Sequence, residues 1–191
     1  MIETELKAVV DDLAACRARV ERAGGVLELE GHLQDCRYED EAGRIRKLDH
    51  VLRVRIFRGP GRSEASLEWK GPTRTVNGLK AREEIGTRVD DPAALTEIVE
   101  RLGYELTRTI DREIAQYTLH GATVRFERYP RMDDLVEVEG SAESIERAIA
   151  ALELPRAIFT TDSLFGFMDR YKARTGKRPI VCAADLGDEE W

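Results

Sequence analysis

The feature of this sequence that most limits its fold is a repeated alternation of apolar with charged residues. It covers seven segments, 2–9, 51–57, 65–70, 79–89, 106–119, 122–129 and 135–140. Such a period of two is typical of β-strands, because successive side chains of a strand point to opposite faces. Gly-Pro and Asn-Gly pairs separate several of these segments, as turns between antiparallel strands would. The alternation therefore predicts a domain built mainly from antiparallel strands.

Three other segments, 11–23, 92–102 and 141–154, have the apolar spacing of amphipathic helices. Each has a typical start or stop signal: Gly24 follows the first, Asp91 can cap the second, and Ser141 can cap the third. A short repeat, VERAG at 20–24 and VERLG at 99–103, suggests two halves that each run strand, helix, strand. A chance match is the alternative. The expected fold class is thus α+β, mainly antiparallel β, with helices packed outside the sheet.

Composition limits the class of protein. The chain has 191 residues, 42% of them apolar, which is enough for a buried core and too many for intrinsic disorder. We expect one domain over 1–182 and a solvated acidic tail over 183–191, and the sequence leaves open whether this tail is ordered. The net charge of −7 disfavours nucleic acid or an anionic membrane as a partner, because both select broad basic surfaces.

Other simple signals are missing from the sequence. No run approaches the roughly 20 apolar residues of a membrane-spanning helix, and the N-terminal segment is charged where a signal peptide would be apolar. We therefore expect a cytoplasmic protein. Three cysteines lie far apart, without a CxxC spacing, and three histidines lie in no nucleophile motif. Neither a disulfide framework, nor a structural zinc site, nor Ser/His or Cys/His catalysis is predicted.

The charged residues of each strand share one face. They are Glu3, Glu5 and Lys7; Arg53 and Arg55; Glu68 and Lys70; Arg82 and Glu84; Arg125 and Glu127; and Glu137 and Glu139. One interpretation is a one-sided sheet whose charged face meets water. The other is a closed barrel with a charged lumen, in which guanidinium groups bind phosphate oxygens and carboxylates bind a divalent ion. Periodicity alone leaves both open.

Several motifs in a fixed order resemble the CYTH superfamily, also called triphosphate tunnel metalloenzymes. They begin with Glu3-Thr4-Glu5-Leu6-Lys7, an ExExK pattern. LRVRIF, LEWKGP, KAREE, IDREIAQY and LVEVEG then follow, so that the resemblance covers about 1–139 and continues toward residue 172. The family includes class IV adenylyl cyclases and thiamine triphosphatases.

The resemblance implies an eight-stranded closed β-barrel, a tunnel that binds a triphosphate with Mg²⁺ or Mn²⁺. By matching position, the implied metal ligands are Glu3, Glu5, Glu137 and Glu139, joined by Glu127 where the family has an aspartate. The implied phosphate-binding residues are Lys7, Arg53, Arg55, Lys70, Arg82 and Arg112, and Lys7 is the catalytic candidate. The stretch 35–40 matches a family motif only loosely and is given no site role. A helix near 160–168 would plug or flank one tunnel end.

Two reactions fit such a lumen. The first is cleavage of a small-molecule triphosphate, inorganic or organic, including ATP or thiamine triphosphate, by a triphosphatase; the alternative is cyclisation of ATP to cyclic AMP and pyrophosphate. A non-catalytic polyphosphate- or nucleotide-binding module and a purely structural barrel are further alternatives. Trp69 and Tyr129 either stack on a base or serve in packing, and packing is the commoner role of strand aromatics. A homodimer is left open.

Overall fold

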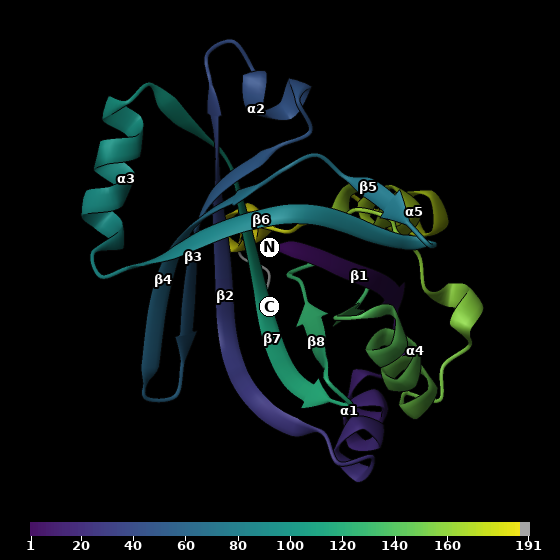
Figure 1. Ribbon diagram of the computed structural model, residues 1–191. Coiled ribbons are helices and arrows are strands. Elements are labelled where there is room, and N and C mark those ends of the chain that lie inside the picture. Colours follow the sequence, from purple (N-terminus) through teal and green to yellow (C-terminus); the bar gives the residue numbers. More distant parts are fainter. Residues whose placement is uncertain (188–191) are drawn as a thin grey trace.

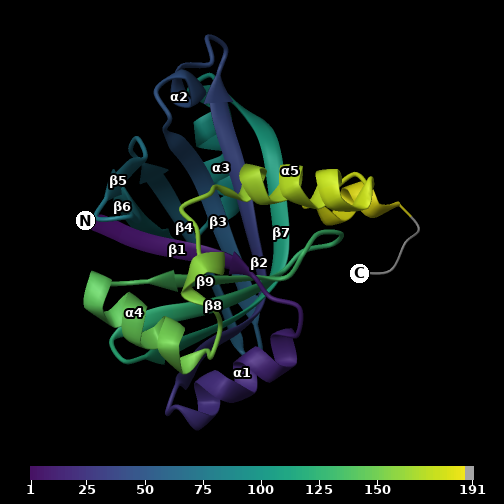
Figure 2. The same cartoon turned by 90° about the vertical axis from the view of Figure 1, so that its right-hand side faces the viewer.

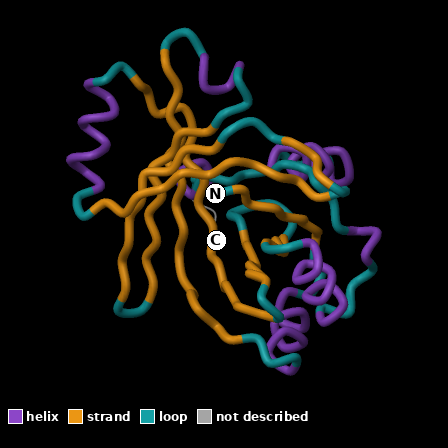
Figure 3. The backbone as a smooth tube through the Cα atoms, in the orientation of Figure 1, coloured by secondary structure: helices purple, strands orange, loops and turns teal. Residues whose placement is uncertain are grey.

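A computed structural model, which describes residues 1–187, shows one antiparallel sheet whose ends meet (Figures 1 and 3). The strands are β1 (Ile2–Val9), β2 (Val26–Asp40), β3 (Val51–Gly59), β4 (Arg62–Lys70), β5 (Arg74–Val76), β6 (Leu79–Val89), β7 (Tyr104–Leu119), β8 (Ala122–Arg128) and β9 (Leu135–Glu139). Their order is β1-β9-β8-β7-β2-β3-β4-β6-β5, and β1 also pairs with β6. Eight strands therefore close into a barrel, and β5 is added at the outer edge of β6.

The strand register brings the charged stripes into the lumen. On one side of β1, Glu5 lies opposite Glu139 and Lys7 opposite Glu137 of β9. On its other side, Glu5 lies opposite Lys80 of β6. Residues opposite one another in a ladder project from the same face, so the stripes of neighbouring strands converge. The expectation of a closed eight-stranded barrel with a charged interior is confirmed.

Helices pack outside this barrel (Figure 2). They are α1 (Leu13–Arg22), α2 (Arg44–Lys47), α3 (Pro92–Arg101), α4 (Ala142–Ala151), α5 (Leu164–Thr175) and two 3₁₀ turns, η1 (Arg156–Ile158) and η2 (Ala183–Leu186). The side chains of Asp12, Asp91 and Ser141 cap α1, α3 and α4 by accepting bonds from first-turn amides. The three helices expected from periodicity are confirmed. α3 starts at the expected residue, whereas α4 starts one residue later and α1 two residues later than expected.

The largest apolar core lies between the barrel and its helices. It combines Leu6 and Val138 from the outer face of the sheet with Val20 of α1 and Ile149 of α4, all at most 2% exposed. A smaller cluster joins Phe167 of α5 to Leu135. Because apolar burial is satisfied outside the barrel, the lumen is free to carry polar and charged groups.

The two halves suggested by the sequence repeat are both present. β1, α1 and β2 form one strand–helix–strand unit; β6, α3 and β7 form the other. The long strands β2 and β7 that complete the units pair with each other. β2 itself is not among the seven segments with clear alternation, because beyond Gly31 its inward side chains mix apolar Leu33 with charged Asp35.

The C-terminal segment is ordered at least as far as η2. Leu186 is buried, and the backbone amide of Ala183 donates to Asp111 Oδ2 at 2.8 Å. The remaining part of the expected tail, residues 188–191, lies outside the described residues. No helix within residues 1–187 combines the length and apolar character needed to cross a membrane.

The backbones of β2 and β3 approach each other closely at Gly31. This glycine has φ +151°, and a Cβ there would lie 2.4 Å from the carbonyl oxygen of Arg58. We expect Gly31→Ala to lower the free energy of unfolding by about 3 kcal/mol, since both strands must shift. Gly61→Ala, also at positive φ but in open space, should lower it by only about 1 kcal/mol.

Chemical denaturation of both variants checks this difference. Equal losses of stability would contradict a packing role for Gly31 and leave only the backbone strain that the two positions share.

Candidate active site

Two adjoining cavities occupy the lumen and its mouths. The larger has a volume of about 790 Å³ and the smaller about 470 Å³. All the cations that the sequence assigned to phosphate binding line the larger one: Lys7, Arg53, Arg55, Lys70, Arg82 and Arg112. Glu5, Glu127 and Glu137 line it too, whereas Glu3 and Glu139 line the smaller cavity. Arg55 borders both, so it stands where the cavities meet.

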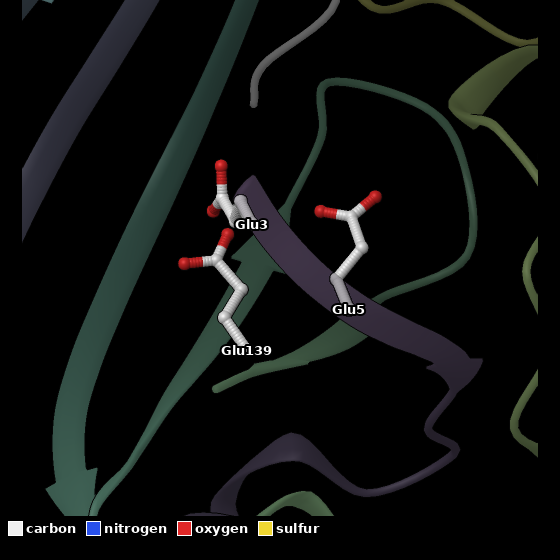
Figure 4. A group of neighbouring side chains, drawn as sticks. All are labelled: Glu3, Glu5 and Glu139. Atoms are coloured by element: carbon white, nitrogen blue, oxygen red, sulfur yellow. The ribbon is translucent and has the colours of Figure 1, made fainter. Parts of the chain in front are cut away.

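Three of the predicted metal ligands form one cluster. Each of Glu3, Glu5 and Glu139 offers a carboxylate oxygen, and these oxygens lie within 4.8 Å of one another. Figure 4 shows the carboxylates of Glu3 and Glu139 side by side, with Glu5 next along β1. The spacing follows from the fold, because Glu3 and Glu5 alternate on β1 while Glu5 is the register partner of Glu139.

The carboxylates of this cluster crowd one another, although each also has a cation nearby. Burial raises the pKa of Glu139 well above its ordinary value, Arg125 opposes that effect, and the neighbouring Glu137 adds to it. Burial and a hydrogen bond with Glu3 likewise raise the pKa of Glu84 to about 7, while the pKa of Glu3 falls to about 2. Crowded oxygen ligands of this kind suit a hard divalent cation, so the residues present fit Mg²⁺ or Mn²⁺.

Glu137 and Glu127 lie beside the cluster and contact lumen cations, of which Arg125 also pairs with Glu139 at 3.1 Å. Glu137 contacts the ammonium group of Lys7 and also Arg125 Nη1, at 3.0 Å. Glu127 accepts from Arg112 Nε at 3.0 Å and from the hydroxyl of Tyr129 at 2.7 Å. Both carboxylates are almost completely buried. In this structure both are counterions of lumen cations, and Glu137 also adjoins Glu139 of the three-carboxylate group.

Asp35 connects most of the arginines. Its two oxygens contact Arg53 at 3.1 Å, Arg55 at 2.8 Å and Arg112 at 3.0 Å, and its side chain is 1% exposed. Burial by itself would raise the pKa of Asp35, but Arg112, Arg53 and Arg55 outweigh it and hold the pKa well below its usual range. The loose match of 35–40 to a family motif gave no hint of this role; a strand period over β2 would have placed Asp35 on the inner face.

The remaining cations of the lumen are also held in place. Lys80 Nζ lies 2.5 Å from Glu5 Oε1, and Lys70 contacts Glu84 and lies 3.7 Å from Glu3. Arg82 donates to the carbonyl oxygens of Gly71 and Asp49, at 2.6 and 2.5 Å. Lys80 was not among the predicted residues, although its alternation with Arg82 and Glu84 places it on the same face of β6.

The two candidate stacking aromatics have other contacts. Trp69 does not border either cavity, and its ring lies edge-on to His50 with centroids 4.9 Å apart. Tyr129 is 4% exposed and its hydroxyl is used by Glu127. Packing therefore accounts for both.

Neither a family model nor a curated protein matches the sequence. Solved structures do match the fold. A protein from Pyrococcus horikoshii is 24% identical, with 85% of this chain and 96% of that chain covered and a TM-score of 0.72. A proposed adenylate cyclase from Vibrio parahaemolyticus is 17% identical, with 88% and 98% covered and a TM-score of 0.76. A proposed adenylyl cyclase from Hippeastrum, described as having a dominant triphosphatase activity, is 16% identical, with 92% and 96% covered and a TM-score of 0.60.

The likeness in fold spans nearly the whole of these chains, and the eight strands close around a lumen in which acidic and basic stripes meet. The comparisons therefore show that this chain shares the closed-barrel fold of these proteins.

Proposed function

We propose that this protein is a divalent-metal-dependent triphosphatase acting on a small-molecule triphosphate inside the barrel. The observation that carries the proposal is the convergence of six candidate phosphate-binding cations on one cavity, beside a three-carboxylate cluster. A linear triphosphate carries several negative charges at neutral pH, so it needs both a set of cationic donors and a metal to neutralise it. A structural barrel would need neither.

Glu3, Glu5 and Glu139 would hold the cation. When bound, Mg²⁺ or Mn²⁺ would supply Lewis-acid stabilisation of charge on the phosphoryl oxygens. The protein's own part is to keep these carboxylates aligned along β1 and β9.

The arginines are paired with carboxylates before substrate arrives. Arg53 contacts Glu68 at 2.5 Å as well as Asp35, and Arg112 contacts both Asp35 and Glu127. Guanidinium groups donate more hydrogen bonds than these carboxylates accept, so phosphate oxygens can share or replace the present partners. The ion-pair network thus preorganises the donors in the positions from which they would clamp the phosphates.

Lys7 would act as a fixed positive charge. Burial alone would lower its pKa, but Glu137, Glu127 and Glu5 outweigh burial and raise that pKa well above its ordinary value. The amine therefore keeps its proton and is unsuited to serve as a general base. Its role would be to stabilise negative charge that develops on the phosphoryl group during water attack.

The Hippeastrum neighbour supports hydrolysis as the first choice, because a dominant triphosphatase activity is described for that protein. Trp69 and Tyr129, the two strand aromatics that could stack on the adenine of ATP, are instead used in packing, so neither favours cyclisation of ATP. Formation of cyclic AMP is therefore the alternative that the first test distinguishes from hydrolysis.

The first test offers the protein tripolyphosphate, thiamine triphosphate or ATP with Mg²⁺ or Mn²⁺ and identifies the products. We expect release of inorganic phosphate, and a loss of at least about 10²-fold in kcat for Lys7→Met, which keeps the side-chain length but removes the charge. Lys177→Met, an exposed lysine outside the lumen, serves as the control. Cyclic AMP with pyrophosphate would replace the proposal by a cyclase, and binding without turnover would replace it by a binding module.

Glu5→Gln tests the metal cluster without relying on turnover. We expect its affinity for Mn²⁺, measured by calorimetry without substrate, to fall at least about tenfold, since one anionic ligand is lost. Glu83→Gln removes the same charge from an exposed position on β6 and should leave Mn²⁺ binding intact. Unchanged binding in a folded Glu5→Gln protein would contradict this ligand assignment.

Asp35→Asn tests the pairing of the arginines. Three guanidinium groups would lose their shared anion, so the free energy of unfolding should fall by about 3 kcal/mol, and tripolyphosphate should restore more stability than it adds to the native protein. Because the pKa of Asp35 is lowered in the folded state, its stabilisation is present above the pKa of the unfolded chain, about 4, and is lost as pH falls further.

Thermal unfolding between pH 3 and 7, with and without tripolyphosphate, measures both effects. The Asp35→Asn variant should lose less stability than the native protein when the pH is lowered, because it has no carboxylate at this position to protonate. Asp90→Asn, at an exposed position, is the matched control, and an equal ligand effect in all three proteins would refute the pairing role.

A further inference from the structure

Three arginines on adjacent strands are register partners at one end of the lumen. Arg37 of β2 is the register partner of Arg53 on β3 and of Arg108 on β7. All three border the larger cavity. Like charges directly opposite one another in a ladder repel, so such a row is unfavourable unless anions compensate it.

The positive charges of these three arginines are not equally neutralised by carboxylates. Arg53 is neutralised by Asp35 and Glu68. Among residues 1–187, neither Arg37 nor Arg108 forms an ion pair with a carboxylate, and Arg37 Nε is buried without a hydrogen-bond partner. Burial, then the charge of Arg53, lowers the pKa of Arg37 to about 10. A buried guanidinium nitrogen with no acceptor is an open position for a ligand oxygen.

The two unpaired guanidinium groups sit under the start of α5. The ring of Phe165 lies 5.6 Å from the guanidinium carbon of Arg37 and 4.5 Å from that of Arg108. Ser163 and Leu164 border the same cavity, and Figure 2 shows α5 lying across this side of the barrel. The aromatic ring holds the side chains in place while leaving their hydrogen-bond donors unused.

The predicted phosphate-binding cations differ from this pair. Lys7, Arg53, Arg55, Lys70 and Arg112 each contact a carboxylate, and Arg82 is bonded to carbonyl oxygens. Among the strand arginines that border the larger cavity within residues 1–187, Arg37 and Arg108, beside α5, are thus the two without a carboxylate or carbonyl partner. The three-carboxylate cluster borders the smaller cavity through Glu3 and Glu139.

We propose that Arg37 and Arg108 form a fourth phosphate subsite, beyond the three phosphates of the proposed function, on which this inference rests. Its ligand would be a phosphate group at the end of the substrate remote from the metal. That group is either the next phosphate of a linear polyphosphate or a phosphate on the organic part of a triphosphate. Both sources offer the same chemistry, oxygens that a guanidinium fork binds.

The test compares tripolyphosphate with tetrapolyphosphate, which differ by one phosphate. Dissociation constants measured by calorimetry with Mg²⁺ should be about tenfold lower for tetrapolyphosphate, the worth of one charge-assisted hydrogen bond. In Arg37→Gln and in Arg108→Gln this preference should disappear, while affinity for tripolyphosphate stays the same. Arg58→Gln removes an equal charge from an exposed position on β3 and should keep the preference.

The outcomes separate the two proposals. If tripolyphosphate is bound and cleaved, but neither tetrapolyphosphate nor the 3′-phosphorylated nucleotide of the second arm binds better than its parent compound, the fourth subsite is wrong and the triphosphatase stands. An equal loss for both ligands in Arg37→Gln would make Arg37 part of the triphosphate cradle and also overturn the subsite. Failure to bind either ligand would refute the proposed function itself. Arg108 is exposed, so its variant keeps the test decisive if Arg37→Gln does not fold.

A second arm identifies the source of the fourth phosphate. ATP is compared with adenosine triphosphate that carries an additional 3′-phosphate. A gain in affinity that depends on Arg37 for the nucleotide, and not for tetrapolyphosphate, would assign the subsite to an organic substrate; the reverse would assign it to polyphosphate. No gain with either ligand would overturn the subsite.

Discussion

Charge balance inside the closed barrel is the constraint on which the rest of this structure depends. Glu127, Glu137, Asp35, Arg53 and Arg112 are each at most 5% exposed, and an isolated charge so far from water is strongly disfavoured. Each is tolerated because an opposite charge lies within hydrogen-bonding distance on a neighbouring strand. The network therefore accounts both for the stability of a charged interior and for the positions in which its donors are held.

Such an interior also requires that stability come from elsewhere. The apolar sides of β1, β8 and β9 pack against α1 and α4, so the main core is a layer outside the barrel. A buried ion pair is weak support for folding, since desolvation offsets most of its attraction. Because the apolar layer is separate from the lumen, the inner residues could serve the proposed ligand binding with little effect on the core.

Positions where like charges lie close together indicate where a ligand of opposite charge could bind. Glu3, Glu5 and Glu139 bring three carboxylates close together, and within residues 1–187 Arg37 and Arg108 have no carboxylate partner. A metal would balance the first set, and a phosphate group the second. Glu3 and Glu139 border the smaller cavity, whereas Glu5 borders the larger one together with Arg37 and Arg108. The two cavities meet at Arg55, an arrangement that would suit the elongated anionic substrate proposed above.

The sequence by itself determined the strand and helix periods, the closed barrel expected from the motifs, and the inner-face position of residues such as Glu5 and Arg55. Only the tertiary structure decided which of them meet. Spacing along one strand says which face a side chain occupies, but register between strands far apart in sequence sets its partners, as for Asp35 with Arg112. Register also brings Glu5 of β1 opposite Glu139 of β9, which completes the cluster with Glu3. It likewise places Arg37 between Arg53 and Arg108, a position that the sequence of β2 alone does not reveal.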